Sequence, residues 1–294
     1  MIRKALMSTI LAIVVYVTAA AFPLTVLYTN DLHVRIDRFD SLSTIISAER
    51  ENEVPLLLFD AGDTWQDHRQ PITNVWGYNE TIAWMNAVAY SAMALGNHDT
   101  AWGPNRLSQL IPEAKFPVLC ANWVPVTGAR TELKPSTILQ VEESRILVVG
   151  LITSEFLPTP AYPQLRYREP IESVREQMAL YAGEFDFLFV VGHISLDNAR
   201  TISRQIPEID LFVSGHSHQR TEMPVREGTT LIVQSGRFGQ ALGRLRLDIS
   251  SGRIEVLAND LIPTERTPVD VRAGVRKFLT TLAVIATATA LWWL

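Results

Sequence analysis

Histidines that follow apolar runs are the first chemical feature of this 294-residue sequence. Five of the six histidines stand at such places, inside short polar clusters: His33, His98, His193, His216 and His218. Asp31, Asp63 and Asn97 occur in the same clusters. One histidine after a strand is usually structural. Five at equivalent positions indicate a shared site, because ligands gather at strand ends in α/β sheets.

The spacing within these clusters favours metal binding. Asp31 and His33 are two residues apart, so on an extended backbone both side chains point to one side and can share a cation. His216 and His218 have the same relation, which lets each of them face a different metal of a close pair. Asp63 follows a glycine that permits a tight turn, and its two oxygens can bridge cations ~3.5 to 4 Å apart.

The elements that position these residues alternate between strand and helix. Apolar runs of strand length lie at residues 24–28, 55–59, 91–95, 117–121, 145–152, 185–191, 209–213 and 230–234. Helical stretches lie at residues 40–50, 79–89, 170–182 and 196–206. Runs without strict alternation predict strands covered on both faces. The stretch that ends at residue 260 alternates about a turn at 251–253, so we expect a mixed α/β (α+β) fold with some antiparallel strands.

Composition narrows the class of protein. With 47% apolar residues, the chain can bury the core of one large domain. It has 26 Lys and Arg against 31 Asp and Glu, and no basic run interleaved with aromatics, so we expect no nucleic-acid partner. Cys120 is the only cysteine, which excludes an intramolecular disulfide and leaves nitrogen and oxygen as metal ligands.

Both ends of the chain carry apolar segments. Residues 1–21 have the basic start, apolar stretch and small residues of a signal peptide, with an uncleaved N-terminal anchor as the alternative. Residues 263–277 are predicted to be a linker. Residues 278–294 are an uncharged candidate membrane helix, and a packing helix is the alternative. We therefore expect an exported protein, periplasmic or extracellular, with membrane attachment if a terminal segment stays in the bilayer.

Five ordered motifs identify a family. NDLH (30–33), DAGD (60–63), LGNHD (95–99), VGH (191–193) and SGHSH (214–218) resemble the calcineurin-like metallophosphoesterases in order and spacing. The flanking text, MNAVAYSAMALGNHD, KFPVLCANW and IVQSGRFGQALGRLRLDI, is similar to the catalytic domain of the 5'-nucleotidase family over residues 22–262. The resemblance implies a four-layer sandwich of two mixed β-sheets flanked by helices.

The resemblance also implies roles for single residues. One metal would be bound by Asp31, His33, Asp63 and His218, and a second by Asp63, Asn97, His193 and His216. His98 matches the catalytic histidine, expected to contact the phosphoryl group and assist the leaving oxygen, with Asn97 and Asp99 beside it. Arg237, Asn97 and His98 are the candidate substrate-binding residues.

Charge counting agrees with these roles. Two divalent cations bring four positive charges, and Asp31 and Asp63 supply only two negative ones. The remaining positive charge suits a phosphate dianion, and a metal-bridging hydroxide is expected to attack in line at neutral pH. Mixed histidine and carboxylate ligands suit manganese, zinc, iron and cobalt alike.

The sequence departs from the family at two places. The family usually reads GNHEFD, whose last aspartate pairs with the catalytic histidine, but Ala101 stands there; Asp99 could orient His98 instead. The family's C-terminal substrate domain has no counterpart in this sequence, so we expect a more open site. Residues near the motifs could replace the substrate contacts of that domain, and the candidates are Trp65, Gln66, His68, Arg69, Trp102, Arg106 and Arg237.

The sequence thus predicts a two-metal phosphoesterase that hydrolyses phosphate monoesters, nucleotides or similar small esters. The alternatives within the superfamily are a phosphodiesterase acting on cyclic nucleotides or nucleotide-sugars and a sulfur-ester hydrolase. An inactive, metal-stabilised binding protein is the alternative from a different class.

Overall fold

The computed structural model describes residues 21–66, 71–101, 103–126, 131–250, 252–270, 272–276 and 279, with the backbone alone for 71–76. The helices are α1 (Phe39–Arg50), α2 (Pro71–Ala87), α3 (Pro104–Leu110), α4 (Pro170–Leu180) and α5 (Leu196–Gln205). Short 3-10 turns lie at Ile36–Arg38, His98–Thr100, Ile111–Glu113 and Thr159–Ala161. Proline opens α3 and α4, and the Ser195 side chain caps α5 by accepting the Asn198 N–H.

The first of two large sheets has six strands in the order β14 (Arg253–Pro263), β13 (Ala241–Ser250), β1 (Phe22–Thr29), β2 (Leu56–Asp60), β3 (Ala92–Ala94) and β4 (Val118–Leu119). β1 to β4 run parallel, and β13 and β14 add an antiparallel pair beside β1. The carboxyl ends of β1, β2 and β3 therefore meet at one edge of the sheet.

The second sheet has the order β11 (Val225–Glu227), β12 (Thr230–Val233), β10 (Leu211–Ser214), β9 (Phe187–His193), β7 (Ser144–Ile152) and β6 (Ser136–Val141). Four parallel strands, β12 to β7, form its centre, and an antiparallel strand lies at each edge. β5 (Trp123–Pro125) and β8 (Leu165–Tyr167) form a separate antiparallel pair.

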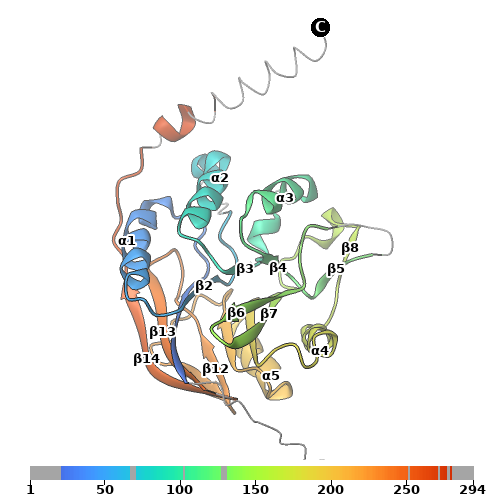
Figure 1. The fold of residues 1–294 in the computed structure, drawn as a ribbon. Helices are drawn as coiled ribbons and strands as arrows, with labels where there is room; N and C mark the ends of the chain where they lie inside the picture. The colour runs from blue at the N-terminus through green and yellow to red at the C-terminus, as the bar shows by residue number, and fades with distance from the viewer. Residues whose placement is uncertain are drawn as a thin grey trace, which may run out of the picture.

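Three apolar clusters join the layers. One packs the two sheets face to face, with Phe59 of β2 against Phe189 of β9 at a ring distance of 6.4 Å. A second packs α1, α2 and α3 on the outer face of the first sheet, and a third packs α4 and α5 on the outer face of the second. Figure 1 shows this order of helices, sheet, sheet and helices. The four-layer sandwich of mixed sheets is confirmed.

Most predicted elements occur within a few residues of their expected bounds, including the antiparallel pair β13 and β14. α2 is the main difference, because it begins at Pro71 and not at residue 79. Its early part contains Gly77, a poor helix former, which hid the periodicity. A methyl group on Gly77 would lie 2.3 Å from Val34 Cγ1, so the fold requires glycine at this close contact.

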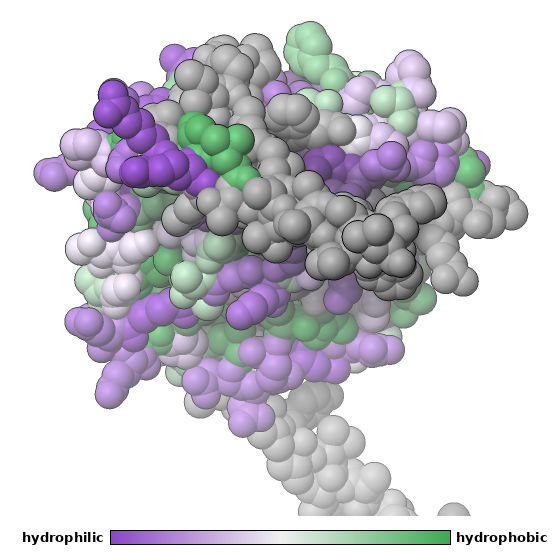
Figure 2. Space-filling model, turned by 90° about the horizontal axis from the view of Figure 1, so that it is seen from above, coloured by the Kyte–Doolittle hydropathy of each residue, from purple (hydrophilic) through white to green (hydrophobic). Residues whose placement is uncertain are grey.

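The upper face of the molecule, seen in Figure 2, is mainly hydrophilic among its coloured residues, with hydrophobic ones in small separate groups. Such scattered apolar residues are ordinary on a protein surface. Within the described ranges, no helix is both long and apolar enough to cross a membrane. The predicted signal peptide and candidate C-terminal membrane helix fall almost entirely outside those ranges.

Candidate metal centre

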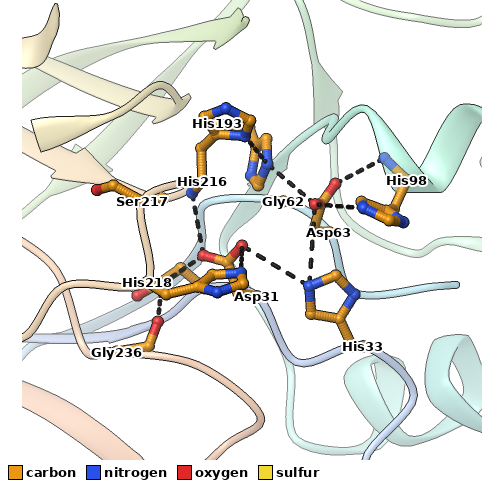
Figure 3. A network of polar contacts seen from close by, with 12 residues as sticks. Asp31, His33, Gly62, Asp63, His98, His193, His216, Ser217, His218 and Gly236 are labelled. Carbon is orange, nitrogen blue, oxygen red and sulfur yellow. Dashed lines mark hydrogen bonds and ion pairs between the residues drawn. The ribbon is translucent and has the colours of Figure 1, made fainter. Parts of the chain in front are cut away.

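The candidate ligands come together where strand ends of the two sheets meet. Asp31 and His33 follow β1, Asp63 follows β2, and Asn97 and His98 follow β3 in the first sheet. From the second sheet, His193 ends β9, and His216 and His218 follow β10. Figure 3 shows His193 and His98 beside Asp63, and His218 and His33 near Asp31, while the dashed line from His216 to Asp31 starts at its backbone nitrogen.

The backbone at this centre is left-handed, which corrects one expectation. Asp31, His33, Asp63, His216 and His218 have φ angles of 51°, 49°, 58°, 68° and 57°. The pairs 31/33 and 216/218 are therefore not extended strands that share a face. Such conformations are unfavourable outside glycine and persist only where surrounding contacts hold them.

Backbone hydrogen bonds supply those contacts. Asp31 N–H donates to Gly62 O at 2.9 Å, His33 N–H donates to Asp63 O at 2.9 Å, and Phe238 N–H donates to Asp31 O at 2.7 Å. The loops after β1 and β2 are thus tied to each other, and the first is also tied to the loop after β12. These ties fix the directions of the ligands.

Asp31 joins ligands from both sheets. Its Oδ1 lies 3.1 Å from His218 Nε2 and 3.8 Å from His33 Nε2. Its Oδ2 accepts the His216 N–H at 3.0 Å and an Asn30 amide hydrogen at 2.6 Å. One carboxylate oxygen therefore faces the centre, while the other fixes the orientation of the group.

Asp63 occupies the middle of the cluster. Its Oδ2 lies 3.1 Å from His193 Nε2 and 3.9 Å from the Nε2 atoms of both His33 and His98. Its Oδ1 accepts the backbone N–H of His98 at 2.8 Å. His33 Nε2 thus lies almost equally far from Asp31 and Asp63, as a group between two sites would.

Hydrogen bonds on the far side of the rings orient three histidines. His33 Nδ1 donates to Gln66 O at 3.0 Å, and His193 Nδ1 donates to Ala61 O at 2.8 Å. Because a carbonyl oxygen only accepts, the lone pair of each neutral ring is on Nε2, which faces the centre. His216 has the opposite arrangement, with Nε2 2.9 Å from Glu155 Oε2 and Nδ1 3.3 Å from His193 Nε2.

Unsatisfied buried atoms show that this donor set fits divalent cations. Asp31 Oδ1, His33 Nε2 and Asn97 Oδ1 are buried and form no hydrogen bond among the described residues. Buried polar atoms without partners are rare, and a bound ion or water is a common explanation for them. Three overlapping groups of side chains could each hold an ion: Asp31, His33 and His218; His33, Asp63 and His98; Asp31, Asp63 and His193.

The pKa values of Asp63 and His193 indicate which of these two groups are charged. Burial alone would raise the pKa of Asp63, but the neighbouring His193, His33 and His98 hold it below its ordinary value. Burial acts to lower the pKa of His193, and Asp63 and Asp31 overcome that effect and raise it to about 10. His193 and Asp63 therefore form an ion pair, and a cation at this place would displace the imidazolium proton.

Asp99 supports the centre in a way the sequence did not indicate. Its carboxylate accepts the backbone N–H groups of Asp63, Thr64, Trp65 and Gly96 at 2.7 to 3.0 Å. Burial, followed by repulsion from Asp63, raises the pKa of Asp99 to about 7. The side chain thus holds the loop that carries Asp63 and is not directed at the ring of His98.

Gln66, and not Asp99, contacts the ring of His98. Gln66 Oε1 lies 3.0 Å from His98 Nδ1, while the Gln66 backbone carbonyl binds His33. An amide oxygen accepts hydrogen bonds as a carboxylate does, but without charge. One buried residue thus orients both a candidate ligand and the candidate catalytic histidine.

The other candidate substrate-contact residues lie in different surroundings. Trp65 is buried in the core beneath the first sheet, and Arg106 packs on Tyr78, so neither is a free substrate contact. Arg237 is exposed, with its guanidinium 5.0 Å from the ring centre of Phe238. His68, Arg69 and Trp102 lie outside the described residues.

Sequence reasoning missed Glu155, which contacts His216. Glu155 follows β7 at the same edge of the second sheet as the ligands that follow β9 and β10. The position of Glu155 after a strand could have indicated its role, but the polar cluster around it contains no histidine.

Comparisons with known proteins agree with this geometry. The family model described as calcineurin-like phosphoesterase matches residues 24–220, which is more than half of the 294-residue chain. The chain therefore belongs to the calcineurin-like phosphoesterase family, and we assign it to the metal-dependent phosphoester hydrolases. The resemblance noted in the sequence is confirmed.

Relatives of this chain include proteins named 5'-nucleotidases. The 5'-nucleotidase of Diplobatis ommata is 29% identical over 282 residues, which cover 80% of this chain and 48% of that protein. The human 5'-nucleotidase is 27% identical over 318 residues, covering 91% of this chain and 54% of that protein. The chain spans about half the length of these relatives.

A solved structure shows the same fold. The 5'-nucleotidase precursor of Thermus thermophilus superimposes with a TM-score of 0.73 at 23% identity, covering 90% of this chain and 59% of that one. At this level of identity, the likeness establishes the fold alone.

Proposed function

We propose that this chain is an exported phosphomonoesterase that hydrolyses nucleotides or similar small phosphate esters with two divalent cations. The supporting observation is the convergence of buried nitrogen and oxygen atoms from both sheets, several of them without hydrogen-bond partners among the described residues. One cation would be held by Asp31, His33, Asp63 and His218, and the other by Asp63, Asn97, His193 and His216.

The charge of these residues suits a phosphate ester. When bound, two divalent cations activate water and stabilise the negative charge that develops on the phosphoryl group. Asp31 and Asp63 neutralise only half of the added charge, so a dianionic phosphate finds a positive site. The full burial of both carboxylates keeps bulk water from screening that attraction.

His98 is proposed to hold or donate a proton at the leaving oxygen. Its Nε2 lies 3.9 Å from Asp63 Oδ2, and 28% of its side chain is exposed, so a bound ester could reach it. Gln66 fixes the ring through Nδ1, which leaves Nε2 directed at the centre. Asn97, whose Oδ1 lacks a partner among the described residues, stands beside it as both ligand and phosphate contact.

The choice of nucleotide monoesters rests on the names of the relatives, which are 5'-nucleotidases. Export rests on the signal-peptide pattern of residues 1–21. Edman sequencing of protein from the medium or periplasm should start near residue 22. A membrane-bound product that retains Met1 would instead support an uncleaved anchor, and protein found only in the cytosol would contradict export.

Metal analysis combined with a substrate panel tests the function. We expect about two divalent ions per chain, hydrolysis of p-nitrophenyl phosphate and AMP, and loss of activity in EDTA that returns with Mn²⁺ or Zn²⁺. Asp63→Asn should lose metal and activity, whereas Asp186→Asn, on the surface, should keep both.

Other outcomes would replace the proposal. Faster turnover of bis(p-nitrophenyl) phosphate or cyclic AMP than of monoesters would indicate a phosphodiesterase. Turnover of S-sulfocysteine alone would indicate a sulfur-ester hydrolase. Protein that binds both metal ions but hydrolyses no phosphate monoester, phosphate diester or sulfur ester would be a metal-stabilised binding protein.

A further inference from the structure

An exposed phenylalanine stands beside the candidate centre. Phe156, in the loop that follows β7, is 85% exposed and has a φ of 54°. A bulky residue in the left-handed region is a conformational outlier, and such outliers concentrate at ligand clamps and active sites. The left-handed backbone is energetically unfavourable, so surrounding contacts must hold it.

The loop around Phe156 is firmly attached, so its exposure is not the result of a loose segment. Glu155 contacts His216 at 2.9 Å, and its N–H donates to Thr153 Oγ1 at 3.1 Å. On the other side, Leu157 is 8% exposed and belongs to the core cluster beneath the first sheet. Residues on both sides of Phe156 are therefore held by contacts, while its aromatic ring projects outward.

Phe156 lines a hollow of about 510 Å³ that reaches the candidate catalytic histidine, and its described lining is Gln66, Asn97, His98, Ala101, Phe156 and Pro158. Small-molecule sites commonly have volumes of about 300–1,000 Å³ with apolar walls and a few polar groups. Asn97 and His98 form the polar end, next to the metal ligands. Phe156, Pro158 and Ala101 form the apolar part, and the small side chain of Ala101 leaves space there.

We propose that this hollow holds the leaving group of the substrate, and that the leaving group carries a flat, uncharged ring that stacks on Phe156, as the base of a nucleoside or an aryl group would. The inference rests on the proposed function and names the substrate class of the same site. An aromatic platform recognises planar groups by stacking. The described lining contains no Lys, Arg, Asp or Glu, so its described part suits an uncharged group.

Kinetics of Phe156→Ala and Phe156→Trp test the stacking role. With metal-loaded full-length protein, Phe156→Ala should raise KM for AMP and p-nitrophenyl phosphate about tenfold, with kcat changed less than about twofold, since stacking on one ring contributes that much. KM for glycerol phosphate should not change, and Phe156→Trp should restore the wild-type KM for the ring substrates. Met223→Ala, which removes an exposed side chain outside the hollow, is the matched control.

Equal KM increases for all three substrates, or no increase for any, would overturn the proposal. Binding of adenosine, measured by calorimetry, separates this inference from the proposed function because it needs no turnover. Adenosine that binds the wild type and binds Phe156→Ala about tenfold more weakly supports the hollow even if no ester is hydrolysed. Adenosine that fails to bind an active wild-type enzyme refutes the hollow and leaves the phosphatase function standing.

Discussion

Gly96→Ala should remove the metals by displacing one carboxylate. A methyl carbon on Gly96 would lie 2.1 Å from Asp63 N and 2.2 Å from Asp63 Oδ1. Carbon ordinarily stays about 3.5 Å from a heavy atom, so Asp63 would have to retreat by about 1 Å. Gly96 does not have a left-handed backbone, so the clash alone determines the effect.

The size of that displacement sets the expected losses. Ligand distances at a metal are fixed to about 0.2 Å, so a shift of about 1 Å breaks the bonds that Asp63 would make to both cations. Overpacking of this kind costs about 1–3 kcal/mol of stability. A misplacement of about 1 Å also lowers rates about 100-fold, so we expect at least that loss in kcat/KM.

Elemental analysis, urea unfolding and p-nitrophenyl phosphate kinetics measure the three effects together. Gly183→Ala is the matched control, because its methyl group meets nothing within 4 Å. Its φ of +80° makes alanine unfavourable by about 1–2 kcal/mol, a stability loss similar to that of Gly96→Ala but without a displaced ligand. If Gly96→Ala binds two metals and keeps kcat/KM within about threefold of wild type, the role given to Asp63 is wrong.

Three further predictions concern single side chains. His98→Ala should lower kcat about 100-fold or more and leave the metal content unchanged, because alanine keeps the backbone N–H that binds Asp63 Oδ1; loss of both metals would make His98 a ligand. Burial raises the pKa of Asp210 from 3.8 to about 6. The free energy of unfolding therefore falls as pH rises through that interval, because the buried carboxyl must ionise. Asp210→Asn should therefore gain about 3 kcal/mol over wild type at pH 8 and little at pH 4 in urea unfolding, and an equal difference at both pH values would contradict the burial effect. Cys120 is 3% exposed, and burial raises its pKa to about 12, so Ellman's reagent should label it at pH 8 only after denaturation; rapid labelling of native protein would show that the loop after β4 opens.

The sequence alone determined the fold class and predicted where the candidate ligands lie. Buried parallel strands appear as continuous apolar runs, and the polar cluster after each run marks its carboxyl end. The sequence therefore predicts that Asp31, Asp63, His193 and His218 lie in one centre. The register of β1 and β2, which pairs Thr29 with Asp60, then sets their loops side by side.

Only the tertiary structure decided the conformations and the supporting contacts. Local spacing suggested extended pairs of ligands, but bonds between loops from different strands hold these residues left-handed. Asp99 and Gln66 act on residues more than thirty positions away in the chain, and Glu155 reaches His216 from another strand. Such contacts depend on how strand ends from two sheets meet in space, and no local pattern of residues encodes that meeting.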